Sequence, residues 1–484
     1  MILVRVLAVA TSAALLAACA AGPEYRKPAV EMPATWKLEA PWRASAPSDA
    51  VAKGEWWESF ADPQLNALAR QTLSASPTIA AANARLAQAR AAVTATSSGL
   101  FPQIALGLRA ARQRISANRP LTNYAAPNFS TTQNDFIGAF AVNYEADVFG
   151  RVQRSIEGAR ASAEQSAADA ENIRLLLITE LAVNYFSLRQ TDIELDVLAR
   201  SIDLQRRSLE LVTARHDLGA ASGLDVAQQQ ALLDITLTQV DVLRKQRSQF
   251  EHAVATLSGT PAPNFSLKAD LAVPTPPVVP IGVPSDLLER RPDVAAAERA
   301  MAAANAQVGV ATAAFYPSIT LGSAYGGEST ALSTLFATPS IIWSLGASLA
   351  QPIFDGGRIR ANSEAARAGY DATVANYRRV VLVAMQEVED GISGVVTLES
   401  AYTQAQEAIK SATRVLNLAT TRYEGGVATY LDVIVAQQAL LNSERQATQL
   451  LGQRMVTSVF LVKALGGDWQ IGRASCRERV FVGV

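Results

Sequence analysis

Few residues of this 484-residue chain have the types and spacing that catalysis requires. It has two histidines, His216 and His252, and two cysteines, Cys19 and Cys476. The sequence contains no Ser/His/Asp, HExxH, P-loop or CxxC pattern. We therefore expect neither an enzyme nor a metal site, and we interpret both histidines as solvated helix residues.

Cys19 is the residue with the clearest chemistry. Arg5 precedes an apolar stretch, and Leu16-Ala17-Ala18-Cys19 forms a lipobox, the pattern of small residues before a cysteine that bacterial lipoprotein processing recognises. The sequence predicts a signal peptide over residues 1–18, a covalent lipid on Cys19 as the only bound group, and a lipid-anchored tether over 19–61. Ala20 in place of Asp after the cysteine favours the outer membrane. The alternative is an ordinary signal peptide with an incidental cysteine.

A second pattern, Arg-x-x-x-Gly-x-x-[Ser/Thr]-x-Leu-Asp-Val, occurs twice. Its glycine can take the left-handed conformation that ends a helix, and its Ser or Thr can cap the next helix, with the Asp completing a near capping box. Each copy therefore predicts a sharp helical hairpin. Structural and functional roles fit the aspartates equally well. The copies are Arg215, Gly219, Ser222, Leu224, Asp225 and Val226, and Arg422, Gly426, Thr429, Leu431, Asp432 and Val433.

These hairpins belong to a larger internal repeat. Residues 77–259 recur at 292–466, shifted by 215 positions up to Gly107 and by 207 positions from Gly150 onward. Such a repeat indicates a tandem structural unit. We predict a first repeat over 62–259 with a helix, two strands and a long helical hairpin, a proline-rich connector over 260–285, and a second repeat over 286–466. The tail 467–484 continues no pattern, and we interpret it as largely non-native.

In each half, the periodicity of apolar residues changes from one typical of helices to one typical of strands. Four segments near 103–110, 136–145, 318–322 and 343–350 alternate apolar with small or polar residues, as transmembrane β-strands do. Long helices are predicted from Gly150 to Gly219 and from Gly357 to Gly426, each spanning roughly 100 Å. Four strands cannot close a barrel and open edges are not tolerated in lipid, so we expect a barrel shared between chains. A soluble hairpin packed on one side is the alternative.

Charge and hydropathy exclude other classes. The net charge is −1, which provides no basic surface for nucleic acid. Although 49% of the residues are hydrophobic, no apolar run after the first 20 residues is long enough for a membrane-spanning helix. A coiled-coil scaffold or adhesin would explain the long helices but would not need the four alternating segments.

Taken together, these features resemble an outer-membrane efflux protein of the TolC-like outer-membrane factor family, in its lipoprotein (NodT-type) branch. The resemblance covers about residues 19–470 and rests on the lipobox, the twofold repeat, the hairpin motif and three short motifs, Gly22-Pro23-Glu24-Tyr25, Trp56-Trp57 and Asp62-Pro63-Gln64-Leu65. It implies an α+β membrane protein in which a trimeric β-barrel, with four strands per chain, continues into a long periplasmic α-helical coiled-coil barrel.

The resemblance also implies partners and sites. A homotrimer lipid-anchored in the outer membrane of a Gram-negative bacterium would extend into the periplasm and dock to a membrane-fusion adaptor and an inner-membrane pump of the resistance-nodulation-division class. Arg215, Gly219, Ser222, Arg422, Gly426 and Thr429 would form the docking tips. Asp225, Tyr423, Leu431 and Asp432 match the periplasmic gate, with Tyr423 as a hydrogen-bond donor.

Two positions depart from some members of the family, since Val435 replaces a second acidic residue and Ala428 replaces an arginine. The alternative function is that of an outer-membrane channel for a type I protein secretion exporter. The sequence does not specify the exported substrate.

Overall fold

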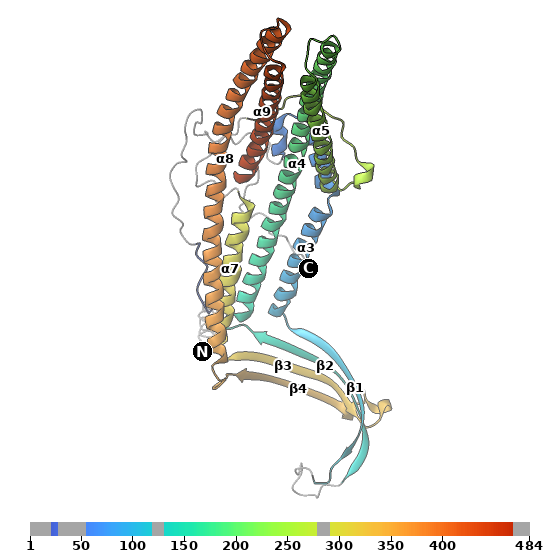
Figure 1. Ribbon diagram of the computed structural model, residues 1–484. Helices are drawn as coiled ribbons and strands as arrows, with labels where there is room; N and C mark the ends of the chain where they lie inside the picture. Colours follow the sequence, from blue (N-terminus) through green and yellow to red (C-terminus); the bar gives the residue numbers. More distant parts are fainter. Residues whose placement is uncertain (1–20, 28–54, 119–129, 278–290, 468–484) are drawn as a thin grey trace. The chain divides into compact units, whose positions relative to one another are not determined.

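The computed structural model describes residues 21–27, 55–118, 130–277 and 291–467 (Figure 1). The predicted signal peptide, Cys19 and nearly all of the tail lie outside the described residues. The chain divides into two compact units, and each draws on both halves of the repeat. The first comprises described parts of 1–28, 86–166 and 297–377, and the second comprises described parts of 29–85, 167–296 and 378–484.

The helices of the two long hairpins have the same lengths in both halves. The first half contains α2 (Pro63–Ala75), α3 (Pro77–Ser97), α4 (Arg151–Asp217) and α5 (Gly223–Leu257), and the second contains α7 (Pro292–Ala313), α8 (Arg358–Glu424) and α9 (Tyr430–Ala464). Helices α4 and α8 each have 67 residues, and α5 and α9 each have 35. The predicted long helices are confirmed. None of these described helices is long and apolar enough to cross a bilayer. Short 3-10 helices are η1 (Trp56–Phe60), η2 (Ser98–Leu100), η3 (Ala262–Asn264), η5 (Leu332–Thr334) and η6 (Thr338–Ser340).

The first unit contains an antiparallel sheet of four strands in chain order (Figure 1). The strands are β1 (Gln103–Ile115), β2 (Thr131–Ala146), β3 (Ser318–Ser329) and β4 (Ile341–Ala350), so the four predicted strands are confirmed. Each strand extends beyond its predicted segment. The central pairing joins the two halves of the repeat, from Phe136 opposite Ser329 to Ala146 opposite Ile319. Strands β1 and β4 form the two edges of the described sheet.

An N-terminal segment, Ala21–Lys27, is held against helices of the first unit. The Ala21 N–H donates to the Phe149 carbonyl at 3.0 Å, and the Arg154 guanidinium donates to the carbonyls of Ala21 and Gly22 at 3.2 and 3.3 Å. Farther along, the Tyr25 hydroxyl donates to Glu298 at 3.0 Å. We call this arrangement the N-terminal clasp.

The clasp is specific to one half of the repeat. Arg154 is buried, whereas its counterpart 207 positions later is Ala361. Close approach of Gly22 to α7 also needs two glycines, because a Cβ on Gly22 would lie 2.6 Å from the Gly309 Cα.

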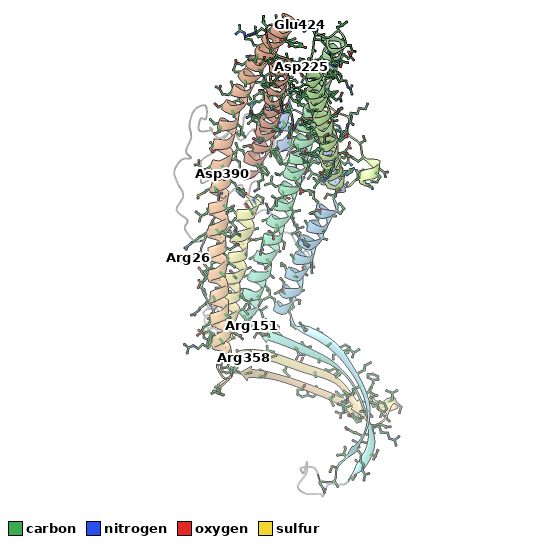
Figure 2. The ribbon with its side chains drawn as sticks, in the orientation of Figure 1. Arg26, Arg151, Asp225, Arg358, Asp390 and Glu424 are labelled. Atoms are coloured by element: carbon green, nitrogen blue, oxygen red, sulfur yellow. The ribbon has the colours of Figure 1, made fainter. Side chains whose placement is uncertain are left out.

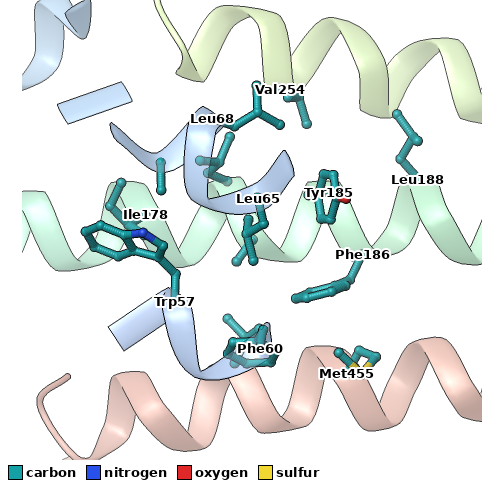
Figure 3. Packing of buried hydrophobic residues seen from close by; sticks show 14 of the residues in the cluster. Trp57, Phe60, Leu65, Leu68, Ile178, Tyr185, Phe186, Leu188, Val254 and Met455 are labelled. Carbon is teal, nitrogen blue, oxygen red and sulfur yellow. The ribbon is translucent and has the colours of Figure 1, made fainter. Parts of the chain in front are cut away.

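The second unit has a hydrophobic core around η1 and α2. Trp57 and Leu65 pack with side chains of α4, α5 and α9, including Tyr185, Val254 and Met455 (Figure 3). Asp62 caps α2 by accepting from the N–H groups of Gln64 and Leu65, and it also accepts from the Tyr185 hydroxyl at 2.7 Å. Helix α2 therefore begins directly after Asp62. Because Asp62 both caps α2 and binds α4, it fixes this short helix against the long one.

Candidate functional site

The candidate site is the pair of helical hairpins in the second unit, formed by α4 with α5 and by α8 with α9. Figure 2 shows Asp225 and Glu424 near the turns of these hairpins. Gly219 and Gly426 have φ angles of 75° and 72°, the left-handed region predicted for both. No heavy atom lies within 4 Å of a Cβ built on either glycine, so backbone conformation rather than space selects glycine here.

Both turns close by the same pattern of backbone hydrogen bonds. The N–H groups of Ala220 and Val427 donate to the carbonyls of Arg215 and Arg422, at 2.8 and 2.9 Å. The glycine N–H groups donate to residues 216 and 423, at 2.8 and 3.0 Å. These are the two bonds of a Schellman motif, which satisfy carbonyls that the helix end would leave free. Each arginine therefore lies in the last turn of its helix, where positive charge is favourable.

The return helices begin with the predicted carboxylate caps. Asp225 accepts from the Ser222 N–H at 3.1 Å, and Asp432 accepts from the Thr429 N–H at 3.0 Å. The hydroxyls differ, since Ser222 Oγ accepts from the Leu224 N–H whereas Thr429 Oγ1 donates to the Asp432 carboxylate. Both aspartates therefore have a structural role at a helix N-terminus, where a negative charge is stabilised.

A polar seam joins the two hairpins near their tips. The Arg215 guanidinium lies 4.8 Å from the centre of the Tyr423 ring and donates to the Tyr423 carbonyl at 3.4 Å. Tyr423 packs in turn against Tyr430, with ring centres 5.0 Å apart. The Tyr430 hydroxyl donates to Gln229 Oε1 at 2.9 Å, and burial raises the pKa of this phenol. Gln437 donates to Ser208 Oγ at 2.8 Å.

Farther from the tips the seam becomes ionic. Arg445 of α9 binds the buried Glu194 of α4 at 2.9 Å and donates to Gln239 of α5 at 3.1 Å. Buried polar groups that are fully paired fix one arrangement of the helices that carry them. The seam therefore sets the register of one hairpin against the other.

The four predicted gate residues differ from one another in how far the structure exposes them. Leu431 and Asp432 are exposed and Asp225 is half-buried, whereas Tyr423 is 9% exposed. Within the described residues the Tyr423 hydroxyl has no hydrogen-bond partner. Its ring lies against Arg215 and Tyr430, and among the residues that the structure describes its hydroxyl donates to no acidic side chain. Of the predicted docking residues, Arg215 lies in the seam while Gly219, Ser222, Arg422, Gly426 and Thr429 are exposed.

Sequence analysis missed most of the seam. Gln229 and Gln437 are 0% and 3% exposed, although glutamine on a helix usually faces solvent. A signal was present, because Gln229 lies between Val226 and Leu232 and Gln437 lies between Ile434 and Leu441, on the apolar faces of their helices. A polar residue at an apolar position predicts a buried hydrogen bond.

Comparison with known proteins identifies the family to which this repeated helical and strand architecture belongs. The family model for outer membrane efflux proteins matches residues 68–260 and 283–467, the two halves of the repeat. The chain belongs to this family, and the predicted resemblance is confirmed.

Two relatives match this chain over nearly its whole length. The chain is 31% identical to the pyoverdine export outer membrane protein OpmQ of Pseudomonas aeruginosa, over 95% of this chain and 96% of that protein. It is 32% identical to the toluene efflux pump outer membrane protein TtgF of Pseudomonas putida, over 96% of each. This protein is therefore an outer-membrane channel component of an efflux system in a Gram-negative bacterium, as predicted.

Solved structures confirm the fold class. The outer-membrane channel OprN matches with a TM-score of 0.84 and 29% identity, over 93% of this chain and 99% of that one. The open state of the Neisseria gonorrhoeae MtrE outer membrane channel matches with a TM-score of 0.80 and 27% identity, over 94% and 99%.

The seam generates a prediction with an internal control. Replacing Tyr430 by Phe removes the donor to Gln229 and leaves a buried acceptor unpaired, so we expect a loss of about 1–3 kcal/mol in the free energy of unfolding. Tyr423→Phe removes a buried hydroxyl without a partner in the described chain and should change stability by less than about 0.5 kcal/mol. Denaturant unfolding of the purified protein in detergent measures both. An equal loss in Tyr423→Phe would mean that this hydroxyl is bonded in the assembly.

Proposed function

We propose that this protein is a homotrimer that conducts small molecules across the outer membrane, receiving them from a periplasmic membrane-fusion adaptor and an inner-membrane pump of the resistance-nodulation-division class. The observation that carries the proposal is the pair of tip hairpins, with matching Schellman turns and exposed motif residues, held together by a buried polar seam. The names of relatives such as the toluene efflux pump protein support small molecules as substrates.

The sheet supports a shared barrel. Strands β1 and β4 are its edges, and an open edge leaves backbone groups without hydrogen-bond partners. Strand β4 runs antiparallel to β3, which is antiparallel to β2, and β2 is antiparallel to β1. Strand β4 of one copy can therefore pair antiparallel with β1 of the next. Exposed apolar side chains at alternate positions of β1, namely Ile104, Leu106 and Leu108, suit contact with lipid.

The N-terminal clasp supports a lipid anchor at Cys19. Cys19 precedes Ala21 by two residues, which span at most about 7 Å of extended chain. The Ala21 N–H is bonded to the Phe149 carbonyl, just after β2 ends at Ala146. A lipid on Cys19 would thus enter the bilayer close to the end of the sheet.

The anchor is tested by Cys19→Ser. We expect this protein to lose incorporation of labelled palmitate, because no acceptor thiol remains, while chains that have lost the signal peptide by another cleavage still insert as a trimer through their sheet. Labelling and chemical crosslinking in isolated outer membranes measure the two properties. Palmitate labelling that persists would refute acylation at Cys19, and crosslinks that yield only monomers from the unmodified protein would refute the shared barrel.

The tips are tested through their glycines. A β-branched residue opposes a left-handed backbone by about 1–2 kcal/mol, so Gly219→Val and Gly426→Val should distort the docking turns and abolish export with little effect on insertion. Asparagine tolerates this conformation, and Gly219→Asn and Gly426→Asn are the matched controls. Export is followed as drug susceptibility of a strain that depends on this channel. Normal export by both valine proteins would place docking elsewhere.

The aspartates are tested as a gate. A trimer would bring Asp225 and Asp432 of every copy towards one axis, and rings of acidic side chains select cations. Asp225→Ala with Asp432→Ala should reduce cation preference and raise resting conductance in planar bilayers. Loss of each cap also costs about 1 kcal/mol, so circular dichroism must show that the helices remain. Unchanged conductance and selectivity in folded trimers would limit the aspartates to capping.

A further inference from the structure

The loop between β3 and β4, residues 330–340, contains no charged residue. It joins the ends of these strands that do not lead into helices (Figure 1). Its sequence TALSTLFATPS includes three large apolar residues, of which Leu332 and Phe336 are 66% and 85% exposed. Exposed apolar side chains that lie close together indicate a surface for contact. We call residues 330–340 the apolar loop.

The apolar loop folds back onto one face of the sheet. Leu335 is only 5% exposed. The strand register places Leu108 opposite Gly138, and Gly138 opposite Gly327. A Cβ on Gly138 would lie 3.2 Å from Leu108 Cδ2 and 3.6 Å from Leu335 Cδ2, and a Cβ on Gly327 would collide with the Leu335 carbonyl. The two glycines therefore form a notch in which the loop backbone approaches the strands closely.

The face that carries this notch is the apolar face of the sheet. The register places one set of large, exposed side chains on it, namely Ile104, Leu106, Leu108, Phe140, Tyr325, Trp343, Leu345 and Leu349. The opposite face has small residues in the same rows, including Ala105, Gly107, Ala141, Ala324, Ser344 and Gly346. A barrel in a membrane turns its apolar face towards lipid. The apolar loop therefore lies on the lipid-facing surface.

Much of the loop backbone is paired within the loop itself. Four N–H groups donate to loop carbonyls at 2.9 to 3.3 Å, those of Thr334, Leu335, Ala337 and Ser340. The Thr334 hydroxyl also donates to the Ala331 carbonyl at 3.1 Å. Backbone groups near hydrocarbon need partners within the protein. The folding of the loop into η5 and η6 supplies these partners and leaves the apolar side chains outermost.

The loop lies at the outer edge of the apolar surface. Tyr325 and Trp343 face each other across β3 and β4, two residues from the notch, and such aromatic residues mark the boundary of a membrane. Farther along β1, the same face has the exposed residues Arg112 and Arg114. Arg112 lies four residues beyond Leu108, about 13 Å along the strand. Positive charge therefore follows the apolar surface directly.

No carboxylate lies opposite these arginines in the register. Their partners on β2 are Asn134 and Thr132, and Arg114 donates to Ser130 Oγ at 3.0 Å. Arginine binds phosphate through two parallel hydrogen bonds, and these bonds are strong because both groups are charged. The apolar loop and the arginines thus offer a lipid both a place for acyl chains and a place for phosphate.

We infer that the apolar loop, with Arg112 and Arg114, forms a contact site for lipopolysaccharide in the outer leaflet of the outer membrane. Lipopolysaccharide carries several acyl chains beneath phosphate groups, which is the order of apolar and positive groups along β1. Leu332 and Phe336 lie among the upper parts of the acyl chains, and the two arginines lie at the phosphates. The inference rests on the proposed barrel, which places this end of the sheet in the outer leaflet.

The phosphate contact is tested by the lipid that the full-length protein retains when it is purified from outer membranes. Arg112→Gln with Arg114→Gln should retain at least about tenfold less lipopolysaccharide, because each cation near a charged lipid surface contributes to binding. Arg112→Lys with Arg114→Lys is the matched control and should retain most of it, since the charge remains. Phospholipid is measured in the same samples and should not change.

The apolar contact is tested with a nitroxide label in membranes, in protein that carries Cys476→Ser. A label at Phe336→Cys should be more accessible to oxygen, which concentrates in hydrocarbon, than to a water-soluble nickel complex. Leu349→Cys, on the apolar face, is the lipid control, and Ser344→Cys, on the opposite face, is the control for water.

The outcomes separate this contact site from the proposed channel. Loss of lipopolysaccharide in the glutamine protein only, with a Phe336 label protected from nickel, supports the site. Equal lipopolysaccharide in all proteins, equal loss of phospholipid, or a Phe336 label open to nickel while the Leu349 label is protected overturns the site and leaves the barrel standing. A Phe336 label closed to both reagents would mean that protein covers the loop, which also overturns the site. A Leu349 label open to nickel would overturn the barrel as well.

Discussion

Six left-handed glycines determine where the long helices of this protein begin and end. Gly150, Gly219 and Gly259 have φ angles between 74° and 76°, and their counterparts Gly357, Gly426 and Gly466 have angles between 72° and 90°. A side chain at such positions costs about 1–2 kcal/mol, so the helix boundaries are encoded by the absence of a Cβ. Equal spacing of the glycines gives equal helices, and equal helices allow the seam of Arg215, Tyr423 and Tyr430 to form at the tips.

Duplication supplied two similar hairpins, and substitution then distinguished their flanks. Glu194 and Arg445 form an ion pair within the chain, whereas Ala401 and Thr238 occupy the equivalent positions. A pair such as Glu194 with Arg445 fixes geometry but is costly to bury unless fully hydrogen-bonded. The N-terminal clasp shows the same divergence, because only the first half has an arginine at the position of Arg154. Small changes on a repeated backbone thus make the two halves unequal.

Much of the fold could be predicted from the sequence because it depends on local signals. The glycine turns, the caps by Asp225 and Asp432, and the alternation of the strands involve residues within a few positions of one another. Strands β1 and β2 extend farther than predicted into segments with charged residues, and one of these residues, Asp135, pairs with Arg109 across the two strands at 2.9 Å. The seam depends on contacts between distant helices, so the burial of Tyr423 beneath Arg215 could not be inferred from spacing.

The order of the strands has a consequence for folding kinetics. Strands β1 and β2 are neighbours in the chain, as are β3 and β4, so each pair closes a short loop. Pairing of β2 with β3 must instead bring together residues separated by α4, α5, the connector and α7. Contacts so distant in sequence form slowly, since the entropy of the intervening chain is lost first. The two strand pairs should therefore form before the four-stranded sheet, with their inner edges, β2 and β3, unpaired until the two halves of the chain meet.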